Sequence, residues 1–335
     1  MSRVQRDMPH QPRPSAQPSV PIGSRVLQLL DVAYRARRPV MLEGQTGIGK
    51  SQIVEQFAQR ARIDYRVLDL SLLEPPDLIG LPQFIDGRTH YAFPAELPTE
   101  GHGVLMLEEL NRAEIPVMQP ALQLLSARRL HSYRLPDGWS CVAAINPEQE
   151  DYAVNTLDKA LRTRFLQLHV HADVGEWLLW AEHANVHPLV VRFVREHDDV
   201  FASSEPRSWA YAADVLAHLT PDELQQRDLV LTLLRGYLST AWATALTETL
   251  GAVRDLPRLD GERCFTEGGV DYLRDLIAPL LRDGRTDAVS MLAFSLRAAT
   301  PPPDAPADRP RALASLFPGD LREQLLRSLR DAEDR

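Results

Sequence analysis

The chain has 335 residues, 44% of them apolar and 25% charged, which is ordinary for a soluble globular protein with room for two domains. Its formal charge is −9, and this acidic balance argues against nucleic acid as the main partner, because phosphate-binding surfaces usually carry a basic excess. No apolar run approaches the length of a membrane span and the N-terminus lacks the apolar core of a signal peptide, so we expect a cytoplasmic protein.

Residues 1–21 contain five prolines among glutamine, serine and arginine. Such a segment buries too little apolar surface to offset the entropy lost on ordering, so we predict a flexible tail. From Ile22 the apolar residues recur at helical spacing up to a basic cluster at 35–38, which suits the C-terminus of a helix. This helix opens a first domain that we expect to span residues 22–172.

A glycine-rich loop is the strongest motif in the chain. It follows an apolar run at 39–42 and leads into an amphipathic helix, which is the context in which G-x-x-x-x-G-K-[ST] binds phosphate. The glycines let backbone N–H groups turn inward, the lysine reaches the β- and γ-phosphates, and the serine hydroxyl ligates Mg²⁺. We therefore predict a nucleoside triphosphate site formed by Gly44, Gln45, Thr46, Gly47, Ile48, Gly49, Lys50 and Ser51.

Strand-like and helix-like segments alternate around this loop, which is typical of a parallel sheet with helices on both faces. The Asp86-Gly87 pair lies between β-forming residues and predicts a hairpin inserted between two sheet strands. A second Asp-Gly pair, at 137–138, predicts another hairpin within 128–139. The five predicted sheet strands are 40–43, 65–70, 103–107, 140–145 and 165–170.

Two adjacent carboxylates, Glu108 and Glu109, follow the third predicted strand. Hydrolysis of a triphosphate needs one acidic group near Mg²⁺ and another that orients the attacking water. Successive residues at a strand end point in opposite directions, so the two acids can serve these two roles. A strand that ends in solvated acids is common, but behind a phosphate loop the pair predicts a catalytic centre.

Asn146 follows the fourth predicted strand and is expected beside the acids, because ligands of an open parallel sheet lie off the carboxyl ends of its strands. The asparagine either holds the attacking water or the γ-phosphate, or it only forms a turn before Pro147. Arg162 and Arg164 precede the fifth strand, and Arg207 begins a later helix. Arginine stabilises the charge of a transferring phosphoryl group, often from a neighbouring subunit, whereas a surface charge pair is the simpler role.

Strand signals stop beyond Asp173, and helical periodicity continues from there. We predict an all-helical lid at 173–250 and a helical C-terminal extension at 251–335 that contains a proline-rich linker near 300–310. The predicted fold class is therefore an α/β P-loop NTPase core with a parallel five-stranded sheet, followed by helical parts.

Taken together, these residues resemble the AAA+ ATPases and, within them, the MoxR type. The resemblance implies that Glu109 is the catalytic base, Asn146 is sensor 1 and Arg207 is sensor 2. It also implies that Arg164 is the arginine finger, with Arg162 as the alternative, and that ATP and Mg²⁺ are the cofactors. The matching motifs follow one another from about residue 22 to residue 250: the phosphate loop (Walker A), 76–80, 108–113 (Walker B), 136–139, 144–147, 157–165 and 206–209.

One position departs from the family pattern. Glu108 stands where the MoxR type usually has aspartate, and the extra methylene moves the carboxylate by about 1.5 Å. We expect Glu108 and Ser51 still to support Mg²⁺, directly or through water, and we expect hydrolysis to be modest.

The resemblance further implies a ring, most simply a homohexamer, that remodels a protein client together with a von Willebrand A-domain protein. The residues after the lid leave no room for such a domain, so we expect the partner to be a separate protein. By the same resemblance Asp86-Gly87 lies in a helix-2 insert and Asp137-Gly138 in a pre-sensor hairpin, two elements that face the ring pore or a client.

Two alternatives stay open at the level of sequence. The first is an ATP-gated scaffold or switch in which Glu108 leaves turnover negligible. The second is a nucleic-acid motor, such as the ATPase subunit of a restriction or anti-phage complex. In that alternative Arg128, Arg129 and Arg134 on the predicted hairpin would line a pore, although the acidic balance speaks against it.

Overall fold

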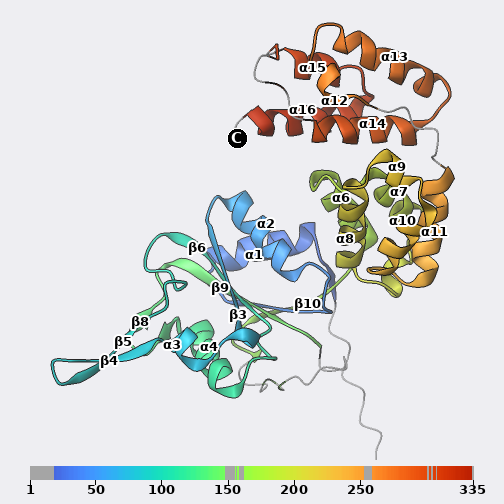
Figure 1. Cartoon of the computed structure of the whole chain (residues 1–335). Helices are drawn as coiled ribbons and strands as arrows, with labels where there is room; N and C mark the ends of the chain where they lie inside the picture. Colours follow the sequence, from blue (N-terminus) through green and yellow to red (C-terminus); the bar gives the residue numbers. More distant parts are fainter. Residues whose placement is uncertain are drawn as a thin grey trace, which may run out of the picture. The chain divides into compact units, whose positions relative to one another are not determined.

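The computed structural model describes residues 19–147, 155, 157, 162–252, 259–299, 302, 305–306 and 308–333. The chain forms two compact units (Figure 1). The first comprises the chain up to Thr46 and Lys50–His171, and the second comprises Gly47–Gly49 and the chain from Ala172 onward. Residues 1–18, most of the predicted tail, lie outside the described range.

The first unit is built on a parallel six-stranded sheet with the strand order β1-β10-β2-β9-β6-β3. The prediction of a parallel α/β sheet is confirmed, and the structure adds the edge strand β1, which pairs with Val170–His171. A two-residue strand has no periodicity and so escapes prediction from sequence. The strands are β1 Val20–Pro21, β2 Val40–Glu43, β3 Asp64–Asp69, β6 His102–Glu108, β9 Gly138–Ile145 and β10 Leu166–His171.

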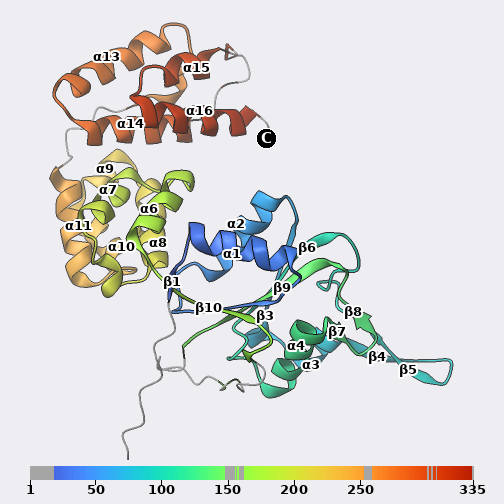
Figure 2. The same cartoon turned by 180° about the vertical axis from the view of Figure 1, so that it is seen from behind.

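Helices cover both faces of this sheet, with α1 and α2 packed together on one face and α3 and α4 on the other (Figures 1 and 2). α2 buries Ile53, Val54, Phe57 and Ala58, the helical spacing that places one apolar stripe against the sheet. The central strands β6 and β9 are buried along nearly their whole length, as expected for parallel strands covered on both faces. The helices are α1 Ser24–Arg35, α2 Lys50–Ala61, η1 Leu70–Leu72, α3 Pro75–Ile79 and α4 Ile115–Ala127.

The first predicted hairpin is confirmed. β4 Leu81–Ile85 and β5 Arg88–Ala92 pair antiparallel and extend away from the sheet (Figures 1 and 2). The turn residues Asp86 and Gly87 have φ angles of 51° and 73°, the positive values that a two-residue turn between twisted strands requires.

The second hairpin exists, but its predicted turn is wrong. β7 Arg129–Leu130 pairs with β8 Tyr133–Arg134, so the turn lies at 131–132, and Gly138 instead begins β9. Leu130 and Tyr133 are buried in the core, and this burial sets a register that the Asp-Gly pair does not reveal. A Cβ on Gly138 would approach a carbonyl oxygen to 2.3 Å, so this glycine permits close packing of the neighbouring chain.

The second unit is helical in its described residues and has two apolar cores. One core, with Trp209 and Phe193 fully buried, lies among α6–α11, and the other, with Phe265 and Phe317, lies among α12–α16. No helix in the described part of the chain is long and apolar enough to cross a membrane. The helices are α6 Val174–His183, α7 Pro188–Glu196, η2 Val200–Ala202, α8 Pro206–Ala217, α9 Pro221–Leu224, α10 Arg227–Arg235, α11 Thr240–Ala252, α12 Gly261–Cys264, α13 Gly269–Arg282, α14 Thr286–Ala298, α15 Arg309–Ala314 and α16 Gly319–Glu333.

His187, directly before α7, is a buried ionisable group in this helical unit. Its side chain packs against the ring of Phe294, with centroids 5.2 Å apart, and its Nδ1 has no hydrogen-bond partner among the described residues. Burial without a partner disfavours the imidazolium and lowers the pKa of His187 from 6.5 to about 4.

This burial predicts an acid-sensitive second unit. Between about pH 6.5 and about pH 4 the unfolded chain binds a proton at His187 and the folded chain does not, so the stability present above this window is lost as the pH falls. We expect the free energy of unfolding to fall by about 1.4 kcal/mol per pH unit there from this residue. Four of the five tryptophans lie in the second unit, so urea denaturation followed by tryptophan fluorescence measures it.

The variant His187→Leu should lose this part of the pH slope, and the exposed His183→Leu serves as the matched control. Equal slopes in the wild type and both variants would show that His187 does not titrate with unfolding.

Candidate functional site

The phosphate loop joins β2 to α2 in the predicted order of strand, loop and helix. Gly47 and Gly49 have φ angles of 77° and 102°, in the region that favours glycine. The N–H of Gly44 donates to Ile145 O at 3.3 Å, which ties the start of the loop to the carboxyl end of β9. α2 begins at Lys50, so the positive end of its dipole lies at the loop and favours an anion there.

The side chain of Lys50 is buried within this loop. Its Nζ donates to Gly44 O at 2.5 Å, to Gln45 O at 2.9 Å and to Asn146 Oδ1 at 3.0 Å. These neutral acceptors hold the ammonium in place beside the backbone N–H groups of the loop, where its charge suits a phosphate group.

The two predicted acids lie at the carboxyl end of β6, where Glu108 is opposite Asp69 of β3. Glu109 has a φ of 54°, a left-handed conformation that is uncommon for a residue other than glycine. Its Oε2 accepts a hydrogen bond from Asn146 Nδ2 at 2.7 Å, and Arg112 NH1 lies 3.4 Å from the same oxygen. The carboxylate of Glu109 is therefore held by one amide and one guanidinium.

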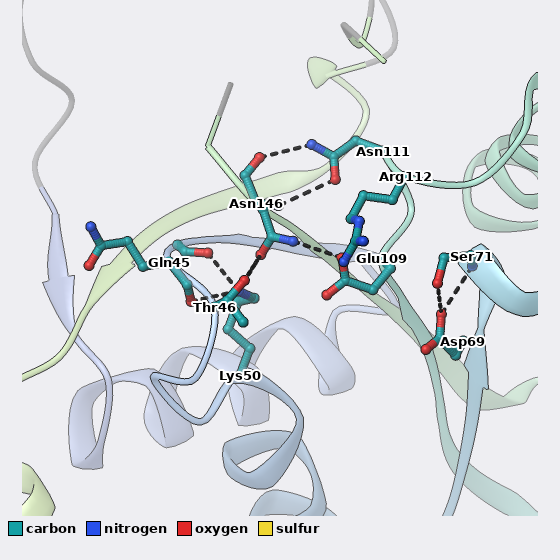
Figure 3. A network of polar contacts seen from close by, with 10 residues as sticks. Gln45, Thr46, Lys50, Asp69, Ser71, Glu109, Asn111, Arg112 and Asn146 are labelled. Carbon is teal, nitrogen blue, oxygen red and sulfur yellow. Dashed lines mark hydrogen bonds and ion pairs between the residues drawn. The ribbon is translucent and has the colours of Figure 1, made fainter. Parts of the chain in front are cut away.

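Asn146 connects the phosphate loop to the acids (Figure 3). It is 1% exposed, and its side chain uses both of its polar atoms. Oδ1 accepts from Lys50 Nζ at 3.0 Å and lies 3.4 Å from Thr46 Oγ1, while Nδ2 donates to Glu109. A side-chain amide offers an acceptor to a cation and a donor to an anion, so Asn146 does more in this structure than form a turn before Pro147.

Two further residues join this network without having been assigned a role from sequence, namely Asn111 and Arg112. The Asn111 side chain is 2% exposed and bonds to the main chain of Asn146, and Arg112 contacts Glu109. Both residues lie directly after Glu109. Two polar side chains so close to the end of a strand could have been recognised from the sequence as candidate site residues.

The two predicted Mg²⁺ ligands offer the chemistry that this ion prefers. Ser51 is the second residue of α2 and supplies a hydroxyl, and the partly exposed Glu108 supplies a carboxylate. Among the described residues no three acidic, histidine or cysteine side chains gather into a metal cluster. Mg²⁺ bound with a nucleotide does not need one, because it keeps waters and phosphate oxygens as most of its ligands.

The three predicted arginines differ in their surroundings. Arg162 forms an ion pair with Glu43, the last residue of β2, and its Nε donates to Gln167 Oε1 at 3.3 Å. Arg164 is exposed and has no ion-pair partner among the described residues. Arg207 lies in the first turn of α8, exposed, within the helical unit. The structure thus brings Thr46, Lys50, Glu109 and Asn146 together, and none of the three arginine side chains forms a hydrogen bond or ion pair with these four residues in the described part of the chain.

Comparison with known proteins found one matching family and several similar proteins. Residues 39–165 match the family AAA domain (dynein-related subfamily). The "Putative chaperone BssE" of Thauera aromatica is 32% identical over 167 residues, which cover 45% of this chain and 58% of that protein. Midasin of Giardia intestinalis is 28% identical over 167 residues, covering 44% of this chain but 3% of that protein. The RuvB Holliday junction branch migration motor of Thermotoga maritima is 17% identical, covers 78% of this chain and 75% of its own, and has a TM-score of 0.36.

A phosphate loop with its lysine, an acidic strand end and an amide that joins them are features that P-loop nucleotide-binding sites share. The segment that contains them matches the AAA domain family, and the parallel α/β core followed by helices is the AAA+ fold. The match to this chain covers 58% of the length of BssE and 3% of the length of midasin.

The contacts of Lys50 predict a binding defect when its charge is removed. We expect Lys50→Met to weaken ATP binding by about 100-fold, because the loop loses the cation that meets the phosphates. Isothermal titration with ATP and Mg²⁺ measures the dissociation constant. Lys159→Met is the control, since residue 159 is the only other lysine in the chain and its loss removes the same charge. Equal affinities for the wild type and Lys50→Met would exclude the loop as the phosphate site.

Proposed function

We propose that this chain is a MoxR-like, ring-forming ATPase that couples hydrolysis of Mg²⁺-ATP to the remodelling of a protein client in the cytoplasm. The observation that carries the proposal is the single amide of Asn146, which contacts both the lysine of the phosphate loop and the carboxylate of Glu109. A γ-phosphate bound at Lys50 would lie within reach of the same amide. The base and the phosphate-binding group are therefore coupled through one residue.

In this mechanism each side chain has one task. Lys50 and the loop N–H groups bind the β- and γ-phosphates, and Ser51 and Glu108 would hold Mg²⁺, which neutralises the developing charge. Glu109 accepts a proton from the attacking water, and Asn146 orients that water or the γ-phosphate. Arg112, whose NH1 lies 3.4 Å from Glu109 Oε2, helps to hold this carboxylate in place.

The proposed arginine finger is Arg164. Arg162 already has a partly buried carboxylate partner in Glu43 of its own chain, so moving it to another subunit would leave Glu43 without its cation. Arg164 is exposed and without an ion pair among the described residues, which suits a guanidinium that acts in a neighbouring subunit. We assign Arg207 the role of sensor 2, at the first turn of a lid helix.

The proposed client is a protein. The hairpin β4–β5 carries three exposed apolar side chains, Leu81, Phe84 and Ile85, and Phe84 is 80% exposed. Such a patch on a projecting element is typical of a protein-binding site. The relative BssE bears the name of a chaperone, which favours the same kind of client. By resemblance we extend the proposal to a homohexamer that works with a von Willebrand A-domain protein.

A second candidate function is an ATP-gated switch with negligible turnover. It is favoured by the contacts of Glu109, whose Oε2 is shared between Asn146 and Arg112. Two donors on one oxygen leave this carboxylate less free to turn toward an attacking water, a contact that turnover requires. A single-turnover experiment distinguishes the two functions, since the switch would form much less than one product per site over hours.

The first test of the main proposal removes the base. We expect Glu109→Gln to abolish steady-state ATP hydrolysis while it keeps ATP binding, because the amide has the same shape but cannot accept the proton. Glu114→Gln, an exposed glutamate five residues further on, is the matched control and should hydrolyse ATP at the wild-type rate. Phosphate release measures turnover. Hydrolysis by Glu109→Gln at the wild-type rate would remove Glu109 from the role of base.

The second test asks whether the site is shared between subunits. We expect Arg164→Ala to lower kcat by about 1000-fold and to keep ATP binding. Mixed with inactive Glu109→Gln, it should regain activity, because about a quarter of the interfaces in an equal mixture combine an intact base with an intact finger. Arg162→Ala mixed with Glu109→Gln is the control. No recovery in the Arg164 mixture, or a strictly monomeric protein with ATP and Mg²⁺, would contradict a shared site.

A further inference from the structure

We propose that Asn111 is a positioning residue for ATP hydrolysis and that it acts by fixing the orientation of Asn146. This inference rests on the proposed function of the same site. It concerns a side chain that contacts neither the phosphate loop nor Glu109 in the network of Figure 3.

The need for such a residue follows from the end of the sheet. β9 ends at Ile145, so Asn146 is the first residue beyond the ladder of the neighbouring strands. The next residue is Pro147, which has no N–H of its own to continue the pairing. The peptide groups of Asn146 are nevertheless buried, and buried peptide groups require hydrogen-bond partners.

Asn111 supplies both partners with one side chain. Its Nδ2 donates to Asn146 O at 2.8 Å, and its Oδ1 accepts from Asn146 N at 3.3 Å. An amide side chain presents a donor and an acceptor side by side, as a paired strand would, and this arrangement fixes the main chain of Asn146 in two places.

The fixed main chain determines where the Asn146 side chain can reach. With its N and O both held, the Cα–Cβ bond points in one direction, and from there Oδ1 meets Lys50 and Nδ2 meets Glu109. Because a displacement of about 1 Å at a catalytic group can cost about 100-fold in rate, loosening this orientation should affect turnover.

The turn that carries Asn111 also carries Glu109, and this makes the arrangement a closed ring of hydrogen bonds. Glu109 binds the side chain of Asn146 while Asn111 binds its main chain. The main-chain O of Asn111 accepts from Asn155 N at 2.7 Å, and Leu110 N donates to Ala144 O at 3.1 Å, so the turn is anchored on both sides. These bonds therefore hold the proposed base and Asn146 next to each other.

Asn111 could act through Asn146, or it could contribute only to the stability of the fold. A double-mutant cycle with Asn146 distinguishes these two roles. If Asn111 acts through Asn146, Asn111→Ala should lower kcat at least about 10-fold, change the dissociation constant of ATP less than about 3-fold, and cause no further loss in the presence of Asn146→Ala. If it acts only on general stability, the losses of the two variants should multiply.

The control is Tyr133→Phe. The Tyr133 hydroxyl donates to a main-chain oxygen, Pro98 O, at 2.7 Å, so this variant also removes a buried bond between a side chain and the main chain, but at a residue without a hydrogen bond to Asn146 or to the turn at 109–111. We expect its kcat to stay within about 2-fold of the wild type.

A second variant keeps the test valid if Asn111→Ala does not fold. Asn111→Asp has the same shape and can accept from Asn146 N, but in its ionised form it cannot donate to Asn146 O. Protonation restores a donor, and burial raises the pKa of an aspartate, so the ratio of its kcat to that of the wild type should rise from about pH 8 to about pH 6.

The outcomes are distinct from those of the proposed function. If the wild type does not hydrolyse ATP, or if Asn146→Ala is as active as the wild type, the proposed function fails and this inference fails with it. If Asn146→Ala is impaired and Asn111→Ala or Asn111→Asp keeps the wild-type kcat, or if the losses multiply, only the role of Asn111 is overturned.

Discussion

The parallel pairing of β2, β9 and β6 is the constraint on which the site depends. Its register places Glu43 opposite Ile145 and Leu107 opposite Ala143, so all three strands end at the same edge of the sheet. Every group of the site leaves the sheet at this edge, as ligand-binding groups do in open α/β sheets. Burial of β6 and β9 on both faces holds the register, because a slip would expose apolar side chains.

At this edge a neutral amide stands between a cation and an anion. Lys50 and Asn146 are 96 residues apart in the chain, and Glu109 and Asn146 are 37 apart, yet one side chain contacts both. An amide can do so because its two ends have opposite hydrogen-bonding character, so neither charge is left buried without a partner. In the proposed mechanism the same amide lets the phosphate-binding lysine and the base respond to each other.

The arginines divide in a corresponding way. Arg162 is held by Glu43, the residue directly before the phosphate loop, whereas Arg164, two positions later, is exposed. The ion pair Glu43–Arg162 thus joins β2, which leads into the phosphate loop, to the segment that carries Arg164. In the proposed ring, that segment would offer Arg164 to the neighbouring subunit. Under the proposed function, this link connects the nucleotide that a subunit binds to the finger that it provides.

The phosphate loop, the parallel α/β core, the acids at a strand end and the first hairpin could be predicted before the fold was known, because glycine spacing, apolar periodicity and the Asp86-Gly87 turn are local properties of the chain. The position of the second turn, the pairing of Arg162 and the contacts of Asn111 became apparent from the folded chain alone. Each of these features depends on hydrogen bonds, ion pairs or burial between residues that are distant in the sequence. Strand register brings those residues together, and no local pattern in the sequence encodes this register.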